Sequence, residues 1–421
     1  MKVLLVGGGG REHALAWKIA QSPLLDGLLA APGNPGIARH AECVPVKAED
    51  IDGLLRLAVD GGVDLTIVGP EIPLVAGLAD RLADEGRAVF GPSARAAALE
   101  GSKAFAKDLM RRYGVPTAPF AVFEDAAAAR RGCRELGAPL VVKADGLAAG
   151  KGAIVCATLE QADDAIAACM ERREFGVAGA RVVIEQFLRG QEASFFALVV
   201  DEDAVPLGAV EDHKSVWDGD RGPNTGGMGA FAPVASVDAP MQARIMREIV
   251  RPTVRGLACE GAPYRGVLYV GLMLTAEGPM VIEFNCRFGD PECQVLMVRL
   301  QGDVLPVLSD VARGKTPPPL GASRAAVCVS LVSGGYPGPY ATGIPIAGVA
   351  DAERRADVCV FHAGTAMKEG RLVTAGGRVL SVTALADDVP AARVRAYEAV
   401  QGIRFEGMHY RRDIGRRARP V

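Results

Sequence analysis

The chain has 421 residues, 49% of them hydrophobic and 23% charged, the balance of a soluble globular protein with about two to four domains. Its formal net charge of −3 excludes a strongly basic surface for nucleic acid or an anionic membrane, and there is no signal-peptide pattern or membrane-length apolar run. Nine cysteines with no Cys-x-x-Cys pair argue against a zinc knuckle and a disulfide framework, and indicate a reducing cytoplasm.

Residues 1–100 alternate between short apolar runs and helical segments. The apolar runs are Lys2–Val6, Leu28–Ala31, Val63–Val68 and Val89–Phe90, and each is followed by a turn rich in glycine or proline. This repeated order of strand, turn and helix predicts an open parallel α/β sheet. Ligands bind at the carboxyl ends of the strands in such sheets, which is where these turns lie.

The middle of the chain has a mixed pattern. Ser102 is suited to cap a helix over Lys103–Tyr113. Beyond about residue 117 we predict a helix over 126–136, strands over 140–144, 153–156 and 181–185, several strands between 191 and 285, and a long helix over 240–259.

The last hundred or so residues follow a proline-rich run, Thr316–Leu320, which predicts a stiff spacer at a domain boundary. Residues 324–385 are strand-rich, with hairpin-like turns at Glu369-Gly370 and Gly376-Gly377. A helix is expected over Pro390–Gln401.

The glycine loop Gly7–Gly10 precedes a helix but does not match the dinucleotide fingerprint. The third glycine would fall at Glu12 or His13, and no acidic residue closes the second strand. A glycine loop before a helix N-terminus nevertheless favours an anion. A phosphorylated substrate, a purely structural turn and NAD remain the alternatives for this loop.

A second glycine-rich stretch, Ala144–Gly152, lacks the spacing of a Walker A motif and lies between two strands. It predicts a flexible hairpin tip that can close over phosphates and exclude water. Lys143 lies in an otherwise apolar strand, so it needs a partner such as phosphate, unless it reaches solvent from the strand end. For Lys151 a phosphate and a solvent-exposed position are equally open.

The segment Val281–Glu292 begins as a buried strand and then becomes polar. Alternate residues of a strand share a face, so Glu283 and Asn285 point the same way. A carboxylate and an amide oxygen suit Mg²⁺ rather than zinc, and Arg287 is a fixed cation that could reach a phosphate. The alternative is a strand end with a solvated turn.

Two other polar stretches are candidates for binding. In Val182–Glu192, the backbone of Gln186–Leu188 could pair with an adenine edge, and Glu192 could take ribose hydroxyls. In Glu211–Gly229, glycines expose backbone amides that can hold a carboxylate or phosphate, although a mobile surface loop is the alternative. His213 is as consistent with a structural histidine as with a catalytic one.

Together these motifs resemble the phosphoribosylamine–glycine ligase family of the ATP-grasp superfamily. The runs that carry the resemblance are Gly8–Ala14, Ala31–Asn34, Val68–Glu71, Glu100–Lys107, Val142–Gly152, Asp212–Lys214, Gly222–Gly229, Ile282–Glu292, Gly334–Gly338 and Tyr410–Gly415. They span the chain from end to end. One departure is Cys293, where the family carries threonine, and it leaves the fine positioning of the Mg²⁺ turn open.

The resemblance implies a multidomain fold of α/β and α+β parts. We expect an N-terminal open parallel α/β domain over 1–101 and a small strand-rich C-terminal domain over 321–421. Between them lies an ATP-grasp domain of two α+β subdomains over 102–320, with its lid subdomain at about 117–190.

The resemblance also assigns roles to residues. The expected ATP-binding residues are Lys103, Lys143, Gly150, Lys151, Gly152, Glu185, Phe187, Leu188 and Glu192. The expected substrate-binding residues are Gly10, Glu12, Glu71, Asn224, Gly226, Gly227 and Met228, the catalytic residues are Arg287, Lys214 and Asp212, and the metal ligands are Glu283 and Asn285.

The activity implied is ligation of glycine to 5-phosphoribosylamine through glycyl phosphate, with ATP as co-substrate and Mg²⁺ or Mn²⁺ as cofactor. We expect a cytoplasmic monomer that binds these small molecules and neither nucleic acid nor membranes. The alternatives are an ATP-grasp ligase for another purine precursor, a nicotinamide-dependent oxidoreductase built on the first hundred or so residues, and a non-catalytic nucleotide-binding module.

Overall fold

The computed structural model describes residues 1–148, 152–322 and 324–416. The N-terminal part is a parallel sheet in the order β3-β2-β1-β4-β5, as the sequence predicts. Its strands are β1 (Lys2–Gly7), β2 (Gly27–Pro32), β3 (Glu42–Cys43), β4 (Leu65–Val68) and β5 (Ala88–Phe90). Its helices are α1 (Gly10–Ile19), α2 (Ile51–Asp60), α3 (Glu71–Val75), α4 (Leu78–Asp84) and α5 (Ala94–Gly101), with a 3-10 turn at Ile37–Arg39.

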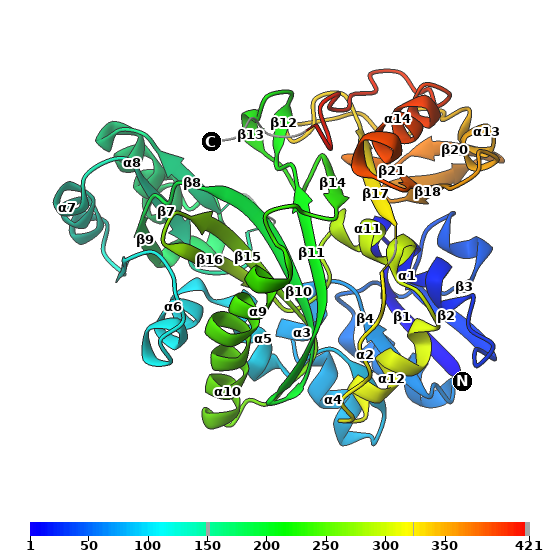
Figure 1. Ribbon diagram of the computed structural model, residues 1–421, viewed down its shortest axis with the longest axis horizontal. Coiled ribbons are helices and arrows are strands. Elements are labelled where there is room, and N and C mark those ends of the chain that lie inside the picture. Colours follow the sequence, from blue (N-terminus) through cyan, green and yellow to red (C-terminus); the bar gives the residue numbers. More distant parts are fainter. Residues whose placement is uncertain (149–151, 323, 417–421) are drawn as a thin grey trace.

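A second, antiparallel sheet, the lid sheet, has the order β6-β9-β7-β8. Its strands are β6 (Phe120–Phe123), β7 (Leu140–Ala144), β8 (Ala153–Cys156) and β9 (Val182–Gln186). Two helices, α7 (Ala126–Leu136) and α8 (Leu159–Ile166), lie beside it, and α8 continues into a π-helical turn at Ala167–Glu171. Figure 1 shows this part at the opposite end of the molecule from the N-terminal sheet.

Helix α6 (Lys103–Arg112) joins the N-terminal sheet to the lid sheet. Ser102 caps it by accepting a hydrogen bond from Phe105 N at 3.1 Å, as expected from the sequence. Asp145, at the end of β7, accepts hydrogen bonds from Ser102 Oγ and Ala104 N, both at 2.9 Å. The start of the glycine-rich stretch is therefore anchored to the N-terminus of α6.

The largest sheet is antiparallel and has the order β16-β15-β10-β11-β14-β17-β21-β18. Its strands are β10 (Gln191–Asp201), β11 (Asp203–Asp212), β14 (Gly229–Ala232), β15 (Tyr264–Thr275), β16 (Gly278–Asn285), β17 (Ala325–Val332), β18 (Val358–His362) and β21 (Arg378–Ala386). β14 pairs with β17, so one sheet continues across the proline-rich spacer into the C-terminal part. The sequence does not predict this pairing.

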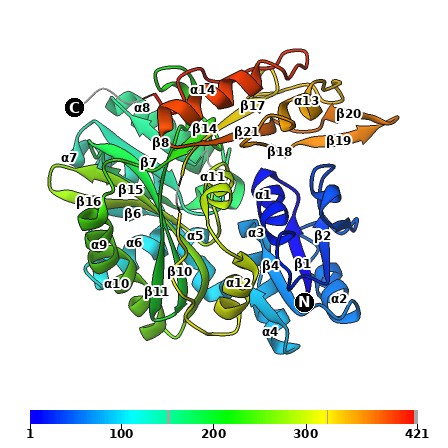
Figure 2. The ribbon, with the colours of Figure 1, turned by 45° about the vertical axis from the view of Figure 1, so that its right-hand side comes forward.

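The remaining helices pack around this sheet (Figures 1 and 2). They are α9 (Ala239–Ile245), which runs through a π-helical turn at Met246–Val250 into α10 (Arg251–Cys259), α11 (Glu292–Arg299), α12 (Val304–Ala312), α13 (Val349–Glu353) and α14 (Val389–Val400). Two small ribbons are formed by β12 (Ser215–Trp217) with β13 (Arg221–Asn224) and by β19 (Thr365–Lys368) with β20 (Arg371–Thr374). A 3-10 turn at Gly176–Ala180 completes the described elements.

Of the two hairpin turns expected in the C-terminal part, one is confirmed and one is wrong. Glu369-Gly370 joins the paired strands β19 and β20. Gly376-Gly377 instead connects β20 to β21, which belong to different sheets. A Cβ atom on Gly364 would lie 2.6 Å from Gly376 Cα, so glycines are required because two backbones cross here.

The hydrophobic core ties the N-terminal sheet to the large sheet. Leu5 of β1, Leu198 of β10 and Leu308 of α12 are buried in one continuous cluster. Helix α1 packs against α11 and β18, which places the C-terminal part over the N-terminal glycine loop (Figure 2). All nine cysteines are free, as expected. In the described ranges, none of the helices has the length and hydropathy needed to cross a membrane.

Candidate active site

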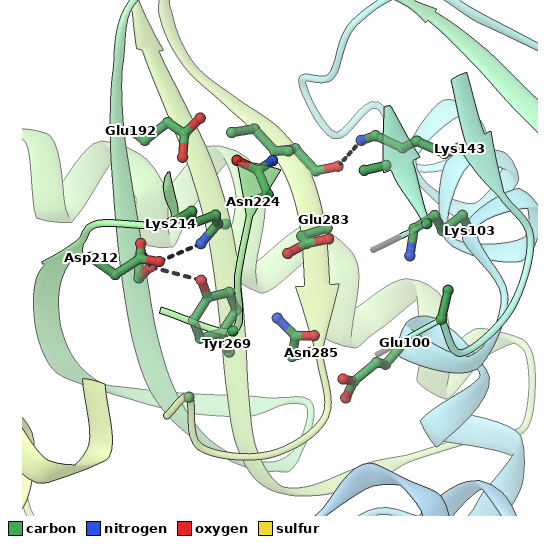
Figure 3. Close-up of a pocket in the computed structure, with 18 of the residues that line it drawn as sticks. Glu100, Lys103, Lys143, Glu192, Asp212, Lys214, Asn224, Tyr269, Glu283 and Asn285 are labelled. Carbon is green, nitrogen blue, oxygen red and sulfur yellow. Dashed lines mark hydrogen bonds and ion pairs between the residues drawn. The ribbon is translucent and has the colours of Figure 1, made fainter. Parts of the chain in front are cut away.

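A cavity of about 470 Å³ opens where the lid sheet, the large sheet and the turns of the N-terminal sheet meet. Figure 3 shows Lys103 and Lys143 on one side of it and Glu192, Asp212 and Lys214 on the other. The candidate residues that line it are Glu71, Lys103, Lys143, Gly152, Glu185, Phe187, Leu188, Glu192, Asp212, Lys214, Asn224, Gly226, Glu283, Asn285 and Arg287. Gly150 and Lys151 lie outside the described residues.

Lys143 is held in a buried cluster of charges. Its Nζ forms an ion pair with Glu185 and donates a hydrogen bond to Ile282 O at 2.8 Å. Glu185 also pairs with Lys107. Burial lowers the pKa of Lys107 to about 8, although the attraction of Glu185 opposes this shift. The sequence predicts phosphate as the partner of Lys143, and the structure supplies a carboxylate from the neighbouring strand. Two lysines share this carboxylate, so the cluster keeps a net positive charge beside the cavity.

Part of the cavity lining is apolar. Val141 and Val155 of the lid sheet and Leu272 and Met273 of β15 line it. Strand β9 ends at Gln186, so the next residues leave the sheet at the cavity edge. Glu192 stands nearby at the start of β10, where its carboxylate is exposed to the cavity (Figure 3).

Glu283 and Asn285 point into the floor of the cavity from β16 (Figure 3). Within the described residues, neither side chain has a hydrogen-bond or ion-pair partner, and no cluster of three or more His, Cys, Asp or Glu residues could enclose a metal. Burial raises the pKa of the Glu283 carboxyl, but the cations around it, above all Lys103, hold this pKa below its ordinary value. Two unpartnered oxygen donors, one of them ionised, fit a hard divalent cation whose other ligands are phosphate and water.

Asp212 and Lys214 face the cavity as an ion pair. Lys214 Nζ lies 2.5 Å from Asp212 Oδ2, and this attraction raises the pKa of Lys214 well above its ordinary value although burial opposes it. Ser194 Oγ donates to Asp212 Oδ1 at 3.3 Å and lies 2.8 Å from Tyr269 OH. His213 lies between the two charged residues but does not line the cavity, because neighbouring side chains in an extended segment point to opposite faces.

Arg287 is fixed by two carboxylates. Its Nη2 donates to Glu100 Oε1 at 2.9 Å, and its Nε donates to Glu71 Oε2 at 3.0 Å. Burial and the charge of Arg287 act on Glu71 in opposite directions, and the pKa of Glu71 ends below its ordinary value. Burial prevails at Glu100 and raises its pKa. The guanidinium of Arg287 therefore stays charged and has a defined position at the cavity wall.

A second cavity, of about 390 Å³, lies over the N-terminal glycine loop. It is lined by the backbone of Gly7–Gly9 together with Glu12, Gly33 and Lys47. The two cavities share Arg11, Pro70 and Asp290 as wall residues. A ligand in the second cavity is thus separated from the first only by this wall.

Four of the expected substrate-binding residues have other neighbours. Glu12 is buried, accepts from Gly9 N at 2.7 Å and pairs with Arg11 at 2.6 Å, so its carboxylate holds the glycine loop. Gly10, Gly227 and Met228 line neither cavity. A Cβ atom on Gly10 would lie 2.6 Å from Gln294 Nε2, and Met228 is fully buried in a small apolar cluster beneath its loop. Gly10, Gly227 and Met228 therefore support the walls, whereas Glu12 both lines the second cavity and holds the glycine loop.

Comparison with known proteins agrees with this arrangement. Residues 1–100, 101–293 and 326–417 match the models of the N domain, the ATP-grasp (A) domain and the C domain of phosphoribosylglycinamide synthetase. A phosphoribosylamine–glycine ligase of Caulobacter vibrioides is 54% identical over 99% of this chain and 98% of its own length. The chain belongs to the phosphoribosylamine–glycine ligase family.

Other relatives agree with this membership. The phosphoribosylamine–glycine ligase of Agrobacterium fabrum is 53% identical over 99% of this chain and 98% of its own length. The crystal structure of a phosphoribosylamine–glycine ligase from Thermotoga maritima has a TM-score of 0.88 at 34% identity, covering 98% of this chain and 100% of that one. A biotin carboxylase domain from Hydrogenobacter thermophilus, at 18% identity and a TM-score of 0.73, covers 97% of this chain and 91% of that one and shares the fold alone.

Sequence reasoning missed several residues that this member of the phosphoribosylamine–glycine ligase family brings to the cavity. They are Glu100, Tyr269, Glu292 and Arg378. Glu100 and Glu292 lie in runs that carry the family resemblance. Each is a charged residue in an otherwise apolar or proline-containing stretch, which could have marked it as a candidate site residue. Tyr269 and Arg378 gave none, because each lies in an ordinary strand and reaches the cavity only through the order of strands in the large sheet.

Proposed function

We propose that the chain ligates glycine to 5-phosphoribosylamine, with conversion of ATP to ADP and phosphate, and forms glycinamide ribonucleotide in de novo purine biosynthesis. The observation that carries this proposal is the common wall of the two cavities. A cation-lined cavity suits a nucleoside triphosphate and a small carboxylate, and the adjoining glycine loop suits a phosphorylated partner. The names of the relatives support the same reaction.

ATP would enter with its adenine against the apolar part of the main cavity lining. The backbone of Gln186–Leu188 would pair with the base edge, and Glu192 would accept from the ribose hydroxyls. The phosphates would lie toward Lys103 and Lys143, since the Lys143 cluster has an excess of positive charge. Gly152 would lie over them from the lid sheet.

Glu283 and Asn285 would hold Mg²⁺ or Mn²⁺ beneath the phosphates. When bound, this cation neutralises charge on the β- and γ-phosphate oxygens. In support, both side chains point into the cavity, and among the described residues neither has a hydrogen-bond or ion-pair partner (Figure 3).

In the first half of the reaction, a glycine carboxylate oxygen would attack the γ-phosphorus and release ADP. Lys214, Asn224 and the backbone around Gly226 would hold glycine, with Asp212 orienting Lys214 and the glycine ammonium. Arg287 would balance the negative charge of the phosphoryl group during its transfer. Its side chain needs no reorganisation, because Glu71 and Glu100 already fix it.

In the second half, the amine of phosphoribosylamine would attack the carbonyl carbon of glycyl phosphate. It would reach this carbon past Arg11, Pro70 and Asp290, with its phosphate over the glycine loop near Glu12. Glycyl phosphate hydrolyses readily in water, and closure of the lid would protect it. We propose a cytoplasmic monomer, and the nine free cysteines support a reducing compartment.

The test is release of ADP from the purified chain with ATP and Mg²⁺, omitting glycine and phosphoribosylamine in turn. The proposal expects full ADP release and amide formation only with both substrates. Equal ADP release when another amino acid replaces glycine would point instead to a ligase for a different precursor. A spectroscopic titration with NADH is expected to detect no binding, and binding there would favour the oxidoreductase alternative.

A further inference from the structure

A buried carboxylate with no role in the arrangement above lies at the junction of the two cavities. Glu292 is the first residue of α11 and follows the turn at Asp290, which lines both cavities. Its side chain lines the main cavity although the residue is only 4% exposed. A Cβ atom on Gly289 would lie 2.4 Å from Glu292 Oε2, so the carboxylate is folded closely over the backbone of Gly289.

The Glu292 carboxylate is otherwise unengaged. In the ranges that the structure describes, no other residue donates a hydrogen bond to this carboxylate or forms an ion pair with it. The backbone amide of Glu292 itself donates a hydrogen bond to it. Asp290, two residues earlier, instead receives the contacts of Arg11, Arg378 and Gln294. A buried carboxylate without a cationic partner is costly, which is a reason to look for a use.

The surroundings of Glu292 bring the pKa of its carboxyl close to neutral pH. Burial, and next the charge of Asp212, raise the pKa of Glu292 to about 7, although Lys214 and Arg287 oppose this. Among the described residues, Tyr269 on β15 and the adjacent Cys293 of α11 also interact electrostatically with Glu292. Apart from Cys293, these residues come from three segments of the cavity wall, namely residues 212–214, β15 and the turn after β16, so the carboxylate stands where the substrates would meet.

The other carboxylates of the cavity are already committed. Asp212 is paired with Lys214, and Glu71 and Glu100 are paired with Arg287. The proposal above assigns Glu283 to the divalent cation and Glu192 to the ribose hydroxyls. Among the described carboxylates of this wall, Glu292 therefore has neither a partner nor an assigned ligand, and it is available to accept a proton.

Amide formation requires such an acceptor. When the neutral amine attacks the acyl carbon, the N–C bond forms and the nitrogen becomes cationic. The C–O bond to phosphate then breaks, and the nitrogen must lose a proton to give the amide. We propose that Glu292 is the general base of this second half of the reaction: its carboxylate takes the proton from the attacking amine and passes it to the departing phosphate or to water. This inference rests on the proposed ligase function.

The experiment compares two nucleophiles in the wild-type chain and in Glu292→Gln. Phosphoribosylamine must lose its proton to a base, whereas hydroxylamine is a strong small nucleophile that captures an acyl phosphate without help from the enzyme. Both reactions share the first half, the formation of glycyl phosphate, so glycine hydroxamate formation is an internal control for folding and for ATP use. Glu292→Asp, which keeps a carboxylate on a shorter stem, is the second variant.

We expect Glu292→Gln to lower amide formation about 100-fold or more while hydroxamate formation stays within about threefold of wild type. Wild-type amide formation should also fall below about pH 7, and this acid limb should disappear in Glu292→Gln. Glu292→Asp should recover part of the activity.

Equal losses in both products would overturn the inference, because Glu292 would then serve folding or glycyl phosphate formation. Unchanged amide formation would overturn it as well. Failure of the ligase proposal gives a different result: the wild-type chain itself would form neither amide nor hydroxamate from glycine.

Discussion

The Arg287 guanidinium and the Glu100 carboxylate lie 2.9 Å apart and join the end of β16 to the end of α5. The second oxygen of Glu100 accepts from Cys286 N at 2.7 Å, so one carboxylate holds both the backbone and the side chain of the cavity wall. This contact links the N-terminal sheet to the strand that carries the candidate metal ligands. The position of Arg287 is therefore set before substrates arrive.

Replacing Glu100 by alanine should be strongly destabilising, because it leaves the charge of Arg287 undercompensated in a buried site. We expect the free energy of unfolding to fall by about 3–5 kcal/mol in urea titrations at pH 7.5. The matched control is Glu202→Ala in the exposed turn between β10 and β11, which should change it by less than about 0.5 kcal/mol. Similar stabilities for the two variants would contradict the structural role of the pair.

Local signals allowed much of the fold to be predicted. The helix over 126–136 and the strands over 140–144 and 153–156 have the expected bounds, because each is set by a cap, a glycine or an apolar run within a few residues. Ser102 likewise starts α6 as expected. These elements depend on short-range chemistry, which a single sequence records.

Long-range pairing could not be predicted in the same way. Nothing near Gly229 indicates that β14 pairs with β17, almost a hundred residues later, and this pairing brings Arg378 to the cavity. The partner of Lys143 was equally hidden, since Glu185 belongs to a strand that is adjacent only in the folded sheet. Candidate residues could be named by type, but their counter-charges depend on strand order.

The metal proposal predicts a specific effect of Glu283→Gln. The substitution keeps the shape of the side chain but removes the charge that favours a divalent cation. We expect turnover to fall on the order of 100-fold and Mn²⁺ binding, measured by water proton relaxation with ADP present, to weaken in parallel. Glu277→Gln, in the exposed turn of the same hairpin, should leave both unchanged. Wild-type Mn²⁺ affinity in Glu283→Gln would remove Glu283 from this role.

Histidines between the N-terminal and C-terminal parts predict a loss of stability in acid. His13 Nδ1 accepts a hydrogen bond from His362 N at 2.7 Å, which requires an unprotonated nitrogen. Burial, with the neighbouring His362, lowers the pKa of His13 to about 2, and burial lowers that of His362 to about 4. As the pH falls below about 6.5, the ordinary histidine pKa, both histidines become protonated in the unfolded chain but stay neutral in the folded chain.

The free energy of unfolding should accordingly fall as the pH drops from about 6.5 to 4, by up to about 1.4 kcal/mol per pH unit for each histidine. His13→Asn keeps an acceptor near the position of Nδ1 but does not titrate. Its free energy of unfolding should therefore depend less steeply on pH than that of wild type, by up to about 1.4 kcal/mol per pH unit. Urea titrations across this range measure it, with the exposed substitution Gln401→Ala as the control of unchanged slope. Parallel curves for wild type and His13→Asn would refute this account.

Arg378 should matter for glycine more than for ATP. It reaches from β21 to the loop that the proposal assigns to glycine, where its Nη1 donates to Gly226 O at 2.6 Å and also contacts Asp290 O. Removing it in Arg378→Ala frees this loop, and the loss of one charge-assisted hydrogen bond should raise the KM for glycine about tenfold or more. Arg378→Lys should recover only part of this, because an ammonium cannot reproduce the guanidinium fork.

Steady-state kinetics with glycine and ATP varied separately measure the effect, and Arg371→Ala, exposed on β20, is the matched control. A rise in the KM for ATP equal to that for glycine would show that Arg378 supports the whole cavity rather than this loop.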